Sequence, residues 1–191
     1  MNVKPSADYI AAAVQAASKG GLPPIHKWNP PFCGDIDMRI ARDGTWFHEG
    51  TPIGRAPLVR LFSTILKRED GKYYLVTPVE KVGIVVEDAP FVAIDFEVSG
   101  EGDDQTLTFT TNVGDQTQAG VDHPIRVVRD AETGEPSPYV HVRDELEALI
   151  DRKSFYRMID LGQHRHHEEV RWFGVMSGGQ FFPIIPSEEL E

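Results

Sequence analysis

The chain is poor in cysteine, in basic residues and in long apolar runs, and each scarcity excludes a class of function. Cys33 is the only cysteine, which excludes an intrachain disulfide and any metal site built from several thiolates. Acidic residues outnumber basic ones by 30 to 19, and the net charge of −11 disfavours binding to duplex nucleic acid. No stretch approaches the roughly 20 apolar residues that cross a bilayer, and the N-terminus lacks the apolar segment of a signal peptide. We therefore expect a soluble, cytoplasmic protein that binds neither duplex nucleic acid nor membrane.

The patterns along the first 88 residues predict an N-terminal helix, a proline-stiffened strap and one α+β module. Ser6 can cap the helix, and Gly20-Gly21 can close it. From Ile36 onward apolar and polar residues alternate, which is typical of a half-buried strand, and Asp43-Gly44 predicts a hairpin turn after it. In chain order the predicted elements are helix 6–19, strap 22–31, strands 36–41 and 45–48, helix 57–68, and strands 72–77 and 82–87.

A second module is predicted from residue 89 to the end of the chain. The segment Asp88-Ala89-Pro90 marks the boundary, so the predicted domains are 1–88 and 89–191. The predicted elements after it are hairpin strands 91–99 and 106–112, strands 125–130 and 139–142, a helix that starts near Asp144, and a final hairpin of strands 169–176 and 181–185.

An internal repeat indicates that the two modules arose by duplication. Residues 38–43 and 125–130 both have the pattern apolar-Arg-apolar-apolar-Arg-Asp and run into a turn. Each is followed by a short strand and by a predicted helix that has an arginine at its start, Arg55 in one copy and Arg143 in the other. We therefore predict an α+β fold of two duplicated β-hairpin–helix–hairpin modules, which would pack together and leave a cleft between them. The alternative is that such patterns recur by chance.

Charged and aromatic residues crowd one part of the first module and form our candidate ligand site. Guanidinium groups match phosphate bidentately, a helix N-terminus attracts anions, a tryptophan can stack on a base, and carboxylates can accept hydrogen bonds from a ribose or base. The candidate ligand-binding residues are Asp35, Asp37, Arg39, Arg42, Trp46 and Arg55. The alternative for the same residues is a set of cross-strand salt bridges beside a core tryptophan.

Two further features could carry chemistry, and we favour a structural interpretation of both. The cluster His164, His166, His167, Glu168 and Glu169 could bind a divalent ion, but it has no second ligand group at a structural-zinc spacing. We interpret it as a solvated loop that enters a strand. A nucleophilic Cys33 would need a histidine beside it, and we expect a buried structural thiol instead.

Several short motifs together resemble the signature of the proteobacterial domain of unknown function 1285. They are Lys27-Trp28-Asn29-Pro30, Cys33-Gly34-Asp35-Ile36-Asp37-Met38, Arg42-Asp43-Gly44-Thr45-Trp46, Gly50-Thr51-Pro52-Ile53, Thr77-Pro78-Val79-Glu80-Lys81-Val82 and Asp88-Ala89-Pro90-Phe91. The resemblance covers nearly the whole chain. It implies a duplicated core with a C-terminal half superficially like pleckstrin-homology folds, a site between the halves suited to a nucleotide-based ligand, and a role in signal transduction. It implies no catalytic residues.

We therefore expect a non-enzymatic regulatory protein that binds a nucleotide-based small molecule. Arg39, Arg42 and Arg55 would hold phosphate, Trp46 would stack on the base, and Asp35 or Asp37 would accept hydrogen bonds. No cofactor, metal ligand or catalytic residue is assigned. The first alternative is a module that docks a partner protein without a small ligand, and the second is a metal-dependent hydrolase centred on His164 and His166.

Overall fold

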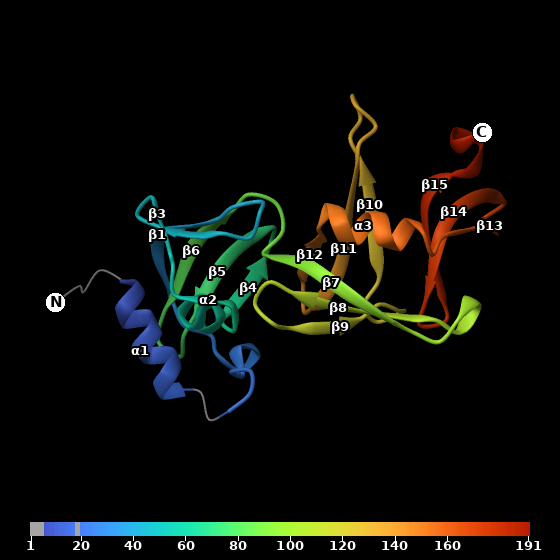
Figure 1. The fold of residues 1–191 in the computed structure, drawn as a ribbon. Coiled ribbons are helices and arrows are strands. Elements are labelled where there is room, and N and C mark those ends of the chain that lie inside the picture. Colours follow the sequence, from blue (N-terminus) through green and yellow to red (C-terminus); the bar gives the residue numbers. More distant parts are fainter. Residues whose placement is uncertain (1–5, 18–19) are drawn as a thin grey trace. The chain divides into compact units, whose positions relative to one another are not determined.

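The structure, a computed structural model, describes residues 6–17 and 20–191 and divides into two compact units, Met1–Pro90 and Phe91–Glu191 (Figure 1). The boundary lies two residues after the one predicted from the sequence. Both units combine β-sheet with short helices, which confirms the predicted α+β class. Among the described residues, no helix has the length and apolar character needed to cross a bilayer.

The first unit is a curled six-stranded sheet with two helices. Strand β1 pairs in parallel with β6, and the other neighbours pair antiparallel, in the order β3-β2-β1-β6-β5-β4. Helix α1 (Ala7–Ala17) buries Ile10 and Val14 and contacts α2. The remaining elements are η1 (Ile25–Lys27), β1 (Phe32–Ile40), β2 (Trp46–His48), β3 (Thr51–Pro52), α2 (Ala56–Ser63), β4 (Leu66–Glu69), β5 (Lys72–Val76) and β6 (Lys81–Val86).

Both helices predicted for the first unit exist, but the second one is shorter than expected. The predicted cap is present in α1, where Ser6 Oγ accepts a hydrogen bond from the amide of Tyr9; residues 18 and 19 of the prediction lie outside the described residues. Helix α2 ends at Ser63, and the predicted helix over 64–68 is wrong because Leu66 begins β4 and pairs with Leu75. Leu66 is buried in β4. An apolar residue at this position suits the buried face of a helix as well as that of a strand, so its apolar character could not distinguish the predicted helix from the observed strand.

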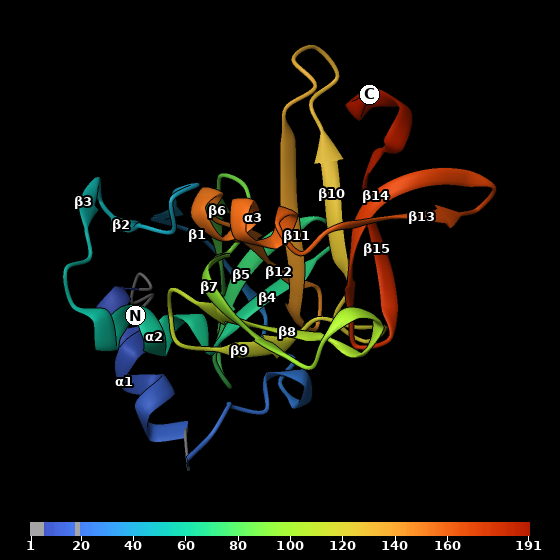
Figure 2. The ribbon, with the colours of Figure 1, turned by 45° about the vertical axis from the view of Figure 1, so that its right-hand side comes forward.

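The second unit contains a six-stranded sheet, one α-helix and a separate three-stranded sheet. The larger sheet has the order β10-β11-β12-β7-β8-β9, and the smaller one has the order β13-β14-β15, with β15 in contact with β10 (Figure 2). Its elements are β7 (Phe91–Ser99), η2 (Gly102–Asp104), β8 (Thr106–Thr111), β9 (Gln116–Gln118), β10 (Ile125–Arg129), β11 (Pro136–Arg143), β12 (Leu146–Ile150), α3 (Arg152–Ile159), β13 (Gln163–His167), β14 (Val170–Ser177), β15 (Gln180–Pro186) and η3 (Ser187–Leu190).

The helix predicted to start near Asp144 is wrong. Residues 146–150 form β12, in which Leu146, Ala148 and Ile150 are buried and the two residues between them are half-buried. This period of two matches a strand, and β12 pairs in parallel with β7. The helix of this unit begins six residues after Leu146, where the Asp151 carboxylate accepts a hydrogen bond from the amide of Ser154 at 2.8 Å and caps α3.

The two large sheets share one topology, which confirms the duplication. In each unit a three-stranded meander is followed by a second one, and the first strand of the first meander pairs in parallel with the last strand of the second. Strand β1 therefore corresponds to β7, and β10 corresponds to β4. The repeat that matched residues 38–43 with 125–130 equated β1 with β10, so that residue alignment is wrong although the duplication itself is present.

Candidate functional site

The six residues predicted to bind a ligand do not form one cluster. Asp35, Asp37 and Arg39 lie on β1, and the chain then turns through Arg42. Trp46 opens β2, and Arg55 is the exposed N-cap residue of α2.

Arg39 and Arg42 contact two carboxylates that follow β6. The Arg39 guanidinium donates to Glu87 Oε1 at 2.5 Å and lies 4.2 Å from the centre of the Phe47 ring. The Arg42 Nε atom is 3.1 Å from Asp88 Oδ2, and its backbone amide donates to Glu87 Oε2 at 3.0 Å. An anionic ligand at either guanidinium would have to compete with these carboxylates.

Trp46 lies in the core of the first unit. Its side chain is 1% exposed, and its ring stacks on Phe62 of α2 with centroids 6.2 Å apart and planes inclined by 23°. The indole Nε1 atom is buried and has no hydrogen-bond partner among the described residues. In this conformation the ring stabilises the packing of α2 on the sheet, and both of its faces are inaccessible to a ligand.

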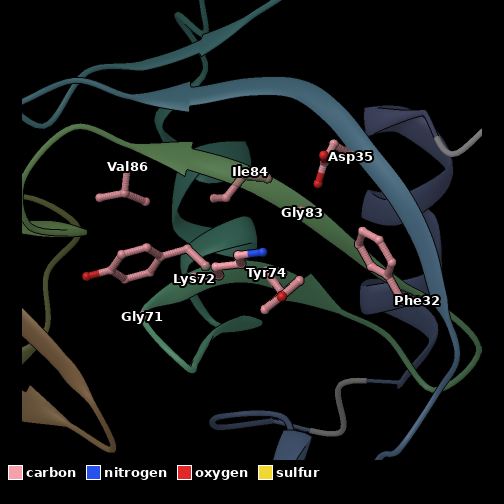
Figure 3. Close-up of a pocket in the computed structure, with 9 residues that line it drawn as sticks. Phe32, Asp35, Gly71, Lys72, Tyr74, Gly83, Ile84 and Val86 are labelled. Atoms are coloured by element: carbon pink, nitrogen blue, oxygen red, sulfur yellow. The ribbon is translucent and has the colours of Figure 1, made fainter.

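A hollow of about 380 Å³ lies over the middle of the first sheet, and Asp35 is the predicted residue that lines it. Gly83 of β6 is directly opposite Asp35 of β1 on one side and Tyr74 of β5 on the other. Figure 3 shows Gly83 between these two neighbouring strands, with Phe32 close to Asp35. The full lining is Phe32, Asp35, Gly71, Lys72, Tyr73, Tyr74, Gly83, Ile84 and Val86.

The absence of a side chain at Gly83 determines the shape of this hollow. A Cβ atom built on Gly83 would overlap the Oδ1 atom of Asp35 and lie within 3.7 Å of the Phe32 ring. Residues paired across strands point to the same face, so the Asp35 carboxylate occupies the space that a side chain at position 83 would fill. The sequence showed Asp35 as one charged residue among several and gave no sign that a glycine 48 positions later makes room for it.

Aromatic rings and amines border the hollow. Phe32 and Tyr74 meet edge to face with ring centroids 5.9 Å apart, and Lys81 Nζ lies 4.8 Å from the centre of the Tyr74 ring. The Lys81 amine also contacts Glu69 at 3.0 Å, whereas the Lys72 side chain lines the hollow and is exposed. The hollow therefore presents a carboxylate, an exposed ammonium group and aromatic edges.

Glu69 of β4 neutralises two amines, that of Lys67 on the same strand and that of Lys81 on β6. It receives hydrogen bonds from Lys67 and Lys81, and these bonds lower the pKa of its carboxyl below the usual range. The contacts measure 2.5 Å to Lys67 and 3.0 Å to Lys81. Lys72 is thus the cation of the hollow that is best placed to meet an anionic group of a ligand.

The histidine-rich segment forms a strand and does not gather into a metal site. Residues 163–167 are β13, so the predicted loop is wrong. His164 Nδ1 lies 2.7 Å from Ser187 Oγ, and its ring contacts Phe173, whereas the ring of His167 contacts Phe181. Within residues 6–17 and 20–191, no three His, Cys, Asp or Glu side chains converge in a way that could hold a metal ion.

Cys33 is exposed, so the expectation of a buried thiol is wrong. It lies near the start of β1, where the first three residues are exposed or half-buried, and its Sγ atom is 3.4 Å from the carbonyl oxygen of Pro31.

A second hollow, of about 410 Å³, lies in the second unit and was not anticipated from the sequence. It is bordered by strand β9 and by the turn of residues 119–124. Asp122 and His123 are its titratable lining residues, and the lining contains no lysine or arginine. Such a surface lacks the cations with which proteins usually bind phosphate.

Comparison with known proteins places the chain in a family. The model described as the N-terminal domain of the domain of unknown function DUF1285 matches residues 23–89, and the model described as the C-terminal domain of the DUF1285 protein of unknown function matches residues 90–184. The chain belongs to the DUF1285 family, which confirms the resemblance drawn from its motifs. No curated protein matches the chain.

Two bacterial structures of the family resemble this one. A DUF1285 family protein from Silicibacter pomeroyi DSS-3 is 63% identical, with a TM-score of 0.86, and the match covers 95% of this chain and 97% of that chain. A DUF1285 family protein from Shewanella baltica OS155 is 28% identical, with a TM-score of 0.51, over 64% of this chain and 90% of that chain. Both support the fold and the family, and their descriptions name no ligand.

Proposed function

We propose that the protein is a non-enzymatic, cytoplasmic regulatory protein that binds a nucleotide-based ligand in the hollow over Gly83 and acts in signal transduction. The observation that carries the proposal is the placement of the Asp35 carboxylate over Gly83, between aromatic rings and beside Lys72. The family resemblance supports the nucleotide class of the ligand.

Four side chains of the hollow match parts of such a ligand. The Asp35 carboxylate accepts hydrogen bonds from amino or imino groups of a base or from ribose hydroxyls. The rings of Phe32 and Tyr74 offer aromatic surface on which a base packs, and the Lys72 ammonium meets a phosphate. In this proposal Phe32 and Tyr74 take the role first predicted for Trp46, which is buried, and Lys72 takes part of the role predicted for the arginines.

A thermal-shift screen against nucleotides, cyclic dinucleotides and stress-signalling nucleotides tests the proposal. A ligand at about 100 times its Kd adds roughly 2.7 kcal/mol to the free energy of unfolding. For a chain of this length that raises the thermal midpoint by roughly 5–10 °C. Parallel samples with a chelator show whether a metal ion takes part, as the metal-dependent alternative requires.

Variants of the hollow distinguish specific binding from a general effect of the added nucleotide on the thermal midpoint. Asp35→Asn and Lys72→Gln should each abolish most of the shift, because each removes a charge that contacts the ligand. Asp37→Asn is the matched control, since Asp37 is an exposed carboxylate on the same strand and does not line the hollow. A shift that survives in the first two variants contradicts the assignment of the site.

The ion pairs of Arg39 and Arg42 favour a second candidate function, the docking of a partner protein. Guanidinium groups that are already paired with Glu87 and Asp88 are less available to a phosphate. Phe32 and Val85 are 55% and 58% exposed, so the first unit also offers apolar surface. If no nucleotide of the panel shifts the thermal midpoint of the wild-type protein, this function is supported over ligand binding.

A further inference from the structure

Two histidine rings of the second unit contact each other through their Nδ1 atoms beside the 410 Å³ hollow. His123 lies in the turn of residues 119–124 that connects β9 to β10, and His141 lies on β11. Their Nδ1 atoms are 2.9 Å apart, with ring centroids 5.1 Å apart. The second nitrogen of His141, Nε2, is 2.6 Å from the backbone carbonyl oxygen of Asp144.

The carbonyl of Asp144 determines where the protons of this pair reside. A carbonyl oxygen can only accept, so His141 carries its hydrogen on Nε2, and its Nδ1 is an acceptor while the ring is neutral. His123 therefore donates its Nδ1–H to His141. One added proton goes to His123 Nε2 and leaves this hydrogen bond in place. A second must go to His141 Nδ1, which makes both facing nitrogens donors and breaks the bond.

The histidine contact ties the turn to β11 through a side chain. The ends of the turn have other ties, because the Ala119 carbonyl accepts a hydrogen bond from Ser177 Oγ and the Pro124 carbonyl accepts one from the amide of His141. Between them, the amides of Gly120 and His123 donate to each other's carbonyl oxygens at 3.0 and 3.2 Å. These two bonds lie within the turn, whereas the His123 side chain links the turn to β11.

Charges on the neighbouring strands are largely compensated. Glu147 of β12 is directly across from His141, and it accepts hydrogen bonds from Arg126 of β10 at 3.1 and 2.9 Å. This ion pair holds the carboxylate of the residue directly across from His141 on β12.

The remaining charged groups lie at the ends of β11 and in the turn. Asp115, between β8 and β9, pairs with Arg143 at the end of β11 at 2.5 Å. The carboxylates of Asp122 and Asp144 are exposed to solvent. The charged groups around His141 are therefore two ion pairs, Arg126–Glu147 and Arg143–Asp115, and two exposed carboxylates, Asp122 and Asp144.

We propose that the His123–His141 pair is a proton-sensitive latch that holds the turn of residues 119–124 against the sheet and releases it when both rings are protonated. Release changes the wall of the second hollow and leaves the strands in place, because the ties at Ala119 and Pro124 do not involve the imidazole rings. The latch is independent of the function proposed for the first unit.

Amide hydrogen exchange of the full-length protein tests the latch. Protection factors, which correct for the intrinsic effect of pH, are measured for Gly120 and His123 at about pH 7.5 and about pH 4, well above and well below the usual histidine titration. Both factors should fall about fivefold or more at the lower pH, which corresponds to the loss of a hydrogen bond worth roughly 1 kcal/mol. Protection of Val140, which is inside the sheet, should stay unchanged.

Two histidine variants make the result specific. His141→Gln keeps an acceptor but cannot gain a proton, so protection of the turn should no longer depend on pH. His166→Gln, which replaces an exposed histidine on β13, should behave like wild type. Equal protection at both pH values in wild type, or an equal loss in His141→Gln, would overturn the proposal.

Imidazole nitrogen NMR of the wild-type protein tests the latch without any substitution. At about pH 7.5 the spectrum should show His141 protonated on Nε2 and His123 protonated on Nδ1. The opposite tautomer of His141 would contradict the proton assignment and with it the latch.

Discussion

Glu80 is a buried carboxyl of the first unit whose surroundings make the stability of the fold depend on pH. Its side chain is 7% exposed, and its Oε1 atom has no hydrogen-bond partner in the described part of the chain. Burial raises the pKa of this carboxyl above its ordinary value of 4.5. The folded state therefore holds the Glu80 proton more tightly than the unfolded chain, and ionisation of Glu80 destabilises the fold.

Glu80→Gln should stabilise the protein at neutral pH. The variant removes the cost of burying this charge, on the order of 1 kcal/mol. Because the wild-type penalty is fully present above the folded pKa and absent below 4.5, the difference between variant and wild type should disappear as the pH falls toward 4.5. Thermal unfolding at a series of pH values measures this, with the exposed Glu49→Gln as control. A gain that is the same at every pH would contradict the account.

At the scale of elements, a buried hydroxyl joins the β14–β15 hairpin to the larger sheet of the second unit. Ser177 Oγ accepts from the amide of Leu107 and donates to the carbonyl of Ala119, both at 2.8 Å. The side chain of Gln105 adds a hydrogen bond to the carbonyl of Met176 at 2.9 Å. The hairpin turn is therefore fastened to both β8 and the end of β9.

Ser177→Ala should destabilise the protein by about 2–4 kcal/mol, because it leaves a buried amide and a buried carbonyl without partners. Chemical denaturation measures the change in the free energy of unfolding. Ser99→Ala, at an exposed position on β7, should change it by less than about 0.5 kcal/mol. Equal effects of the two substitutions would show that the buried hydroxyl does not fasten the hairpin.

The sequence predicted most elements of the fold, and its errors have a common cause. Residues 146–150 contain Leu, Glu and Ala, which favour helix, but they also alternate at the period of a strand. Pairing with β7, whose residues lie more than 50 positions earlier, decides in favour of the strand. The premature end of α2 also follows from strand pairing, because Leu66 pairs with Leu75 of β5 in the neighbouring hairpin. The pattern within one segment does not show which other strand the segment pairs with.

At the scale of the whole molecule, one topology supports two different surfaces. In the first unit the central parallel pair brings Asp35 beside Gly83. In the second unit the equivalent parallel pair is β7 with β12. The paired residues of β7, Phe91, Val92 and Ala93, are all apolar. The duplication thus repeats the sheet, whereas the hollow lined by Asp35 and Lys72 belongs to the first copy, as expected when function resides in side chains carried by a shared fold.

The candidate site could be predicted only in part for the same reason. Its residue types were visible in the sequence, and Asp35 does line a hollow. The carboxylates that pair with Arg39 and Arg42, and the glycine that makes room for Asp35, lie more than 40 positions later and come close only through the parallel pairing of β1 and β6.

The central claim, that the hollow over Gly83 binds a nucleotide-based ligand, is tested most directly by calorimetric titration of Gly83→Ala with the nucleotide that shifts the wild type. A methyl group at position 83 displaces the Asp35 carboxylate, so we predict that the affinity falls by at least about tenfold, or 1.4 kcal/mol. Gly54→Ala is the matched control, since its added methyl group meets open space. If Gly83→Ala binds as tightly as Gly54→Ala and the wild type, the ligand does not occupy this hollow and the claim is contradicted.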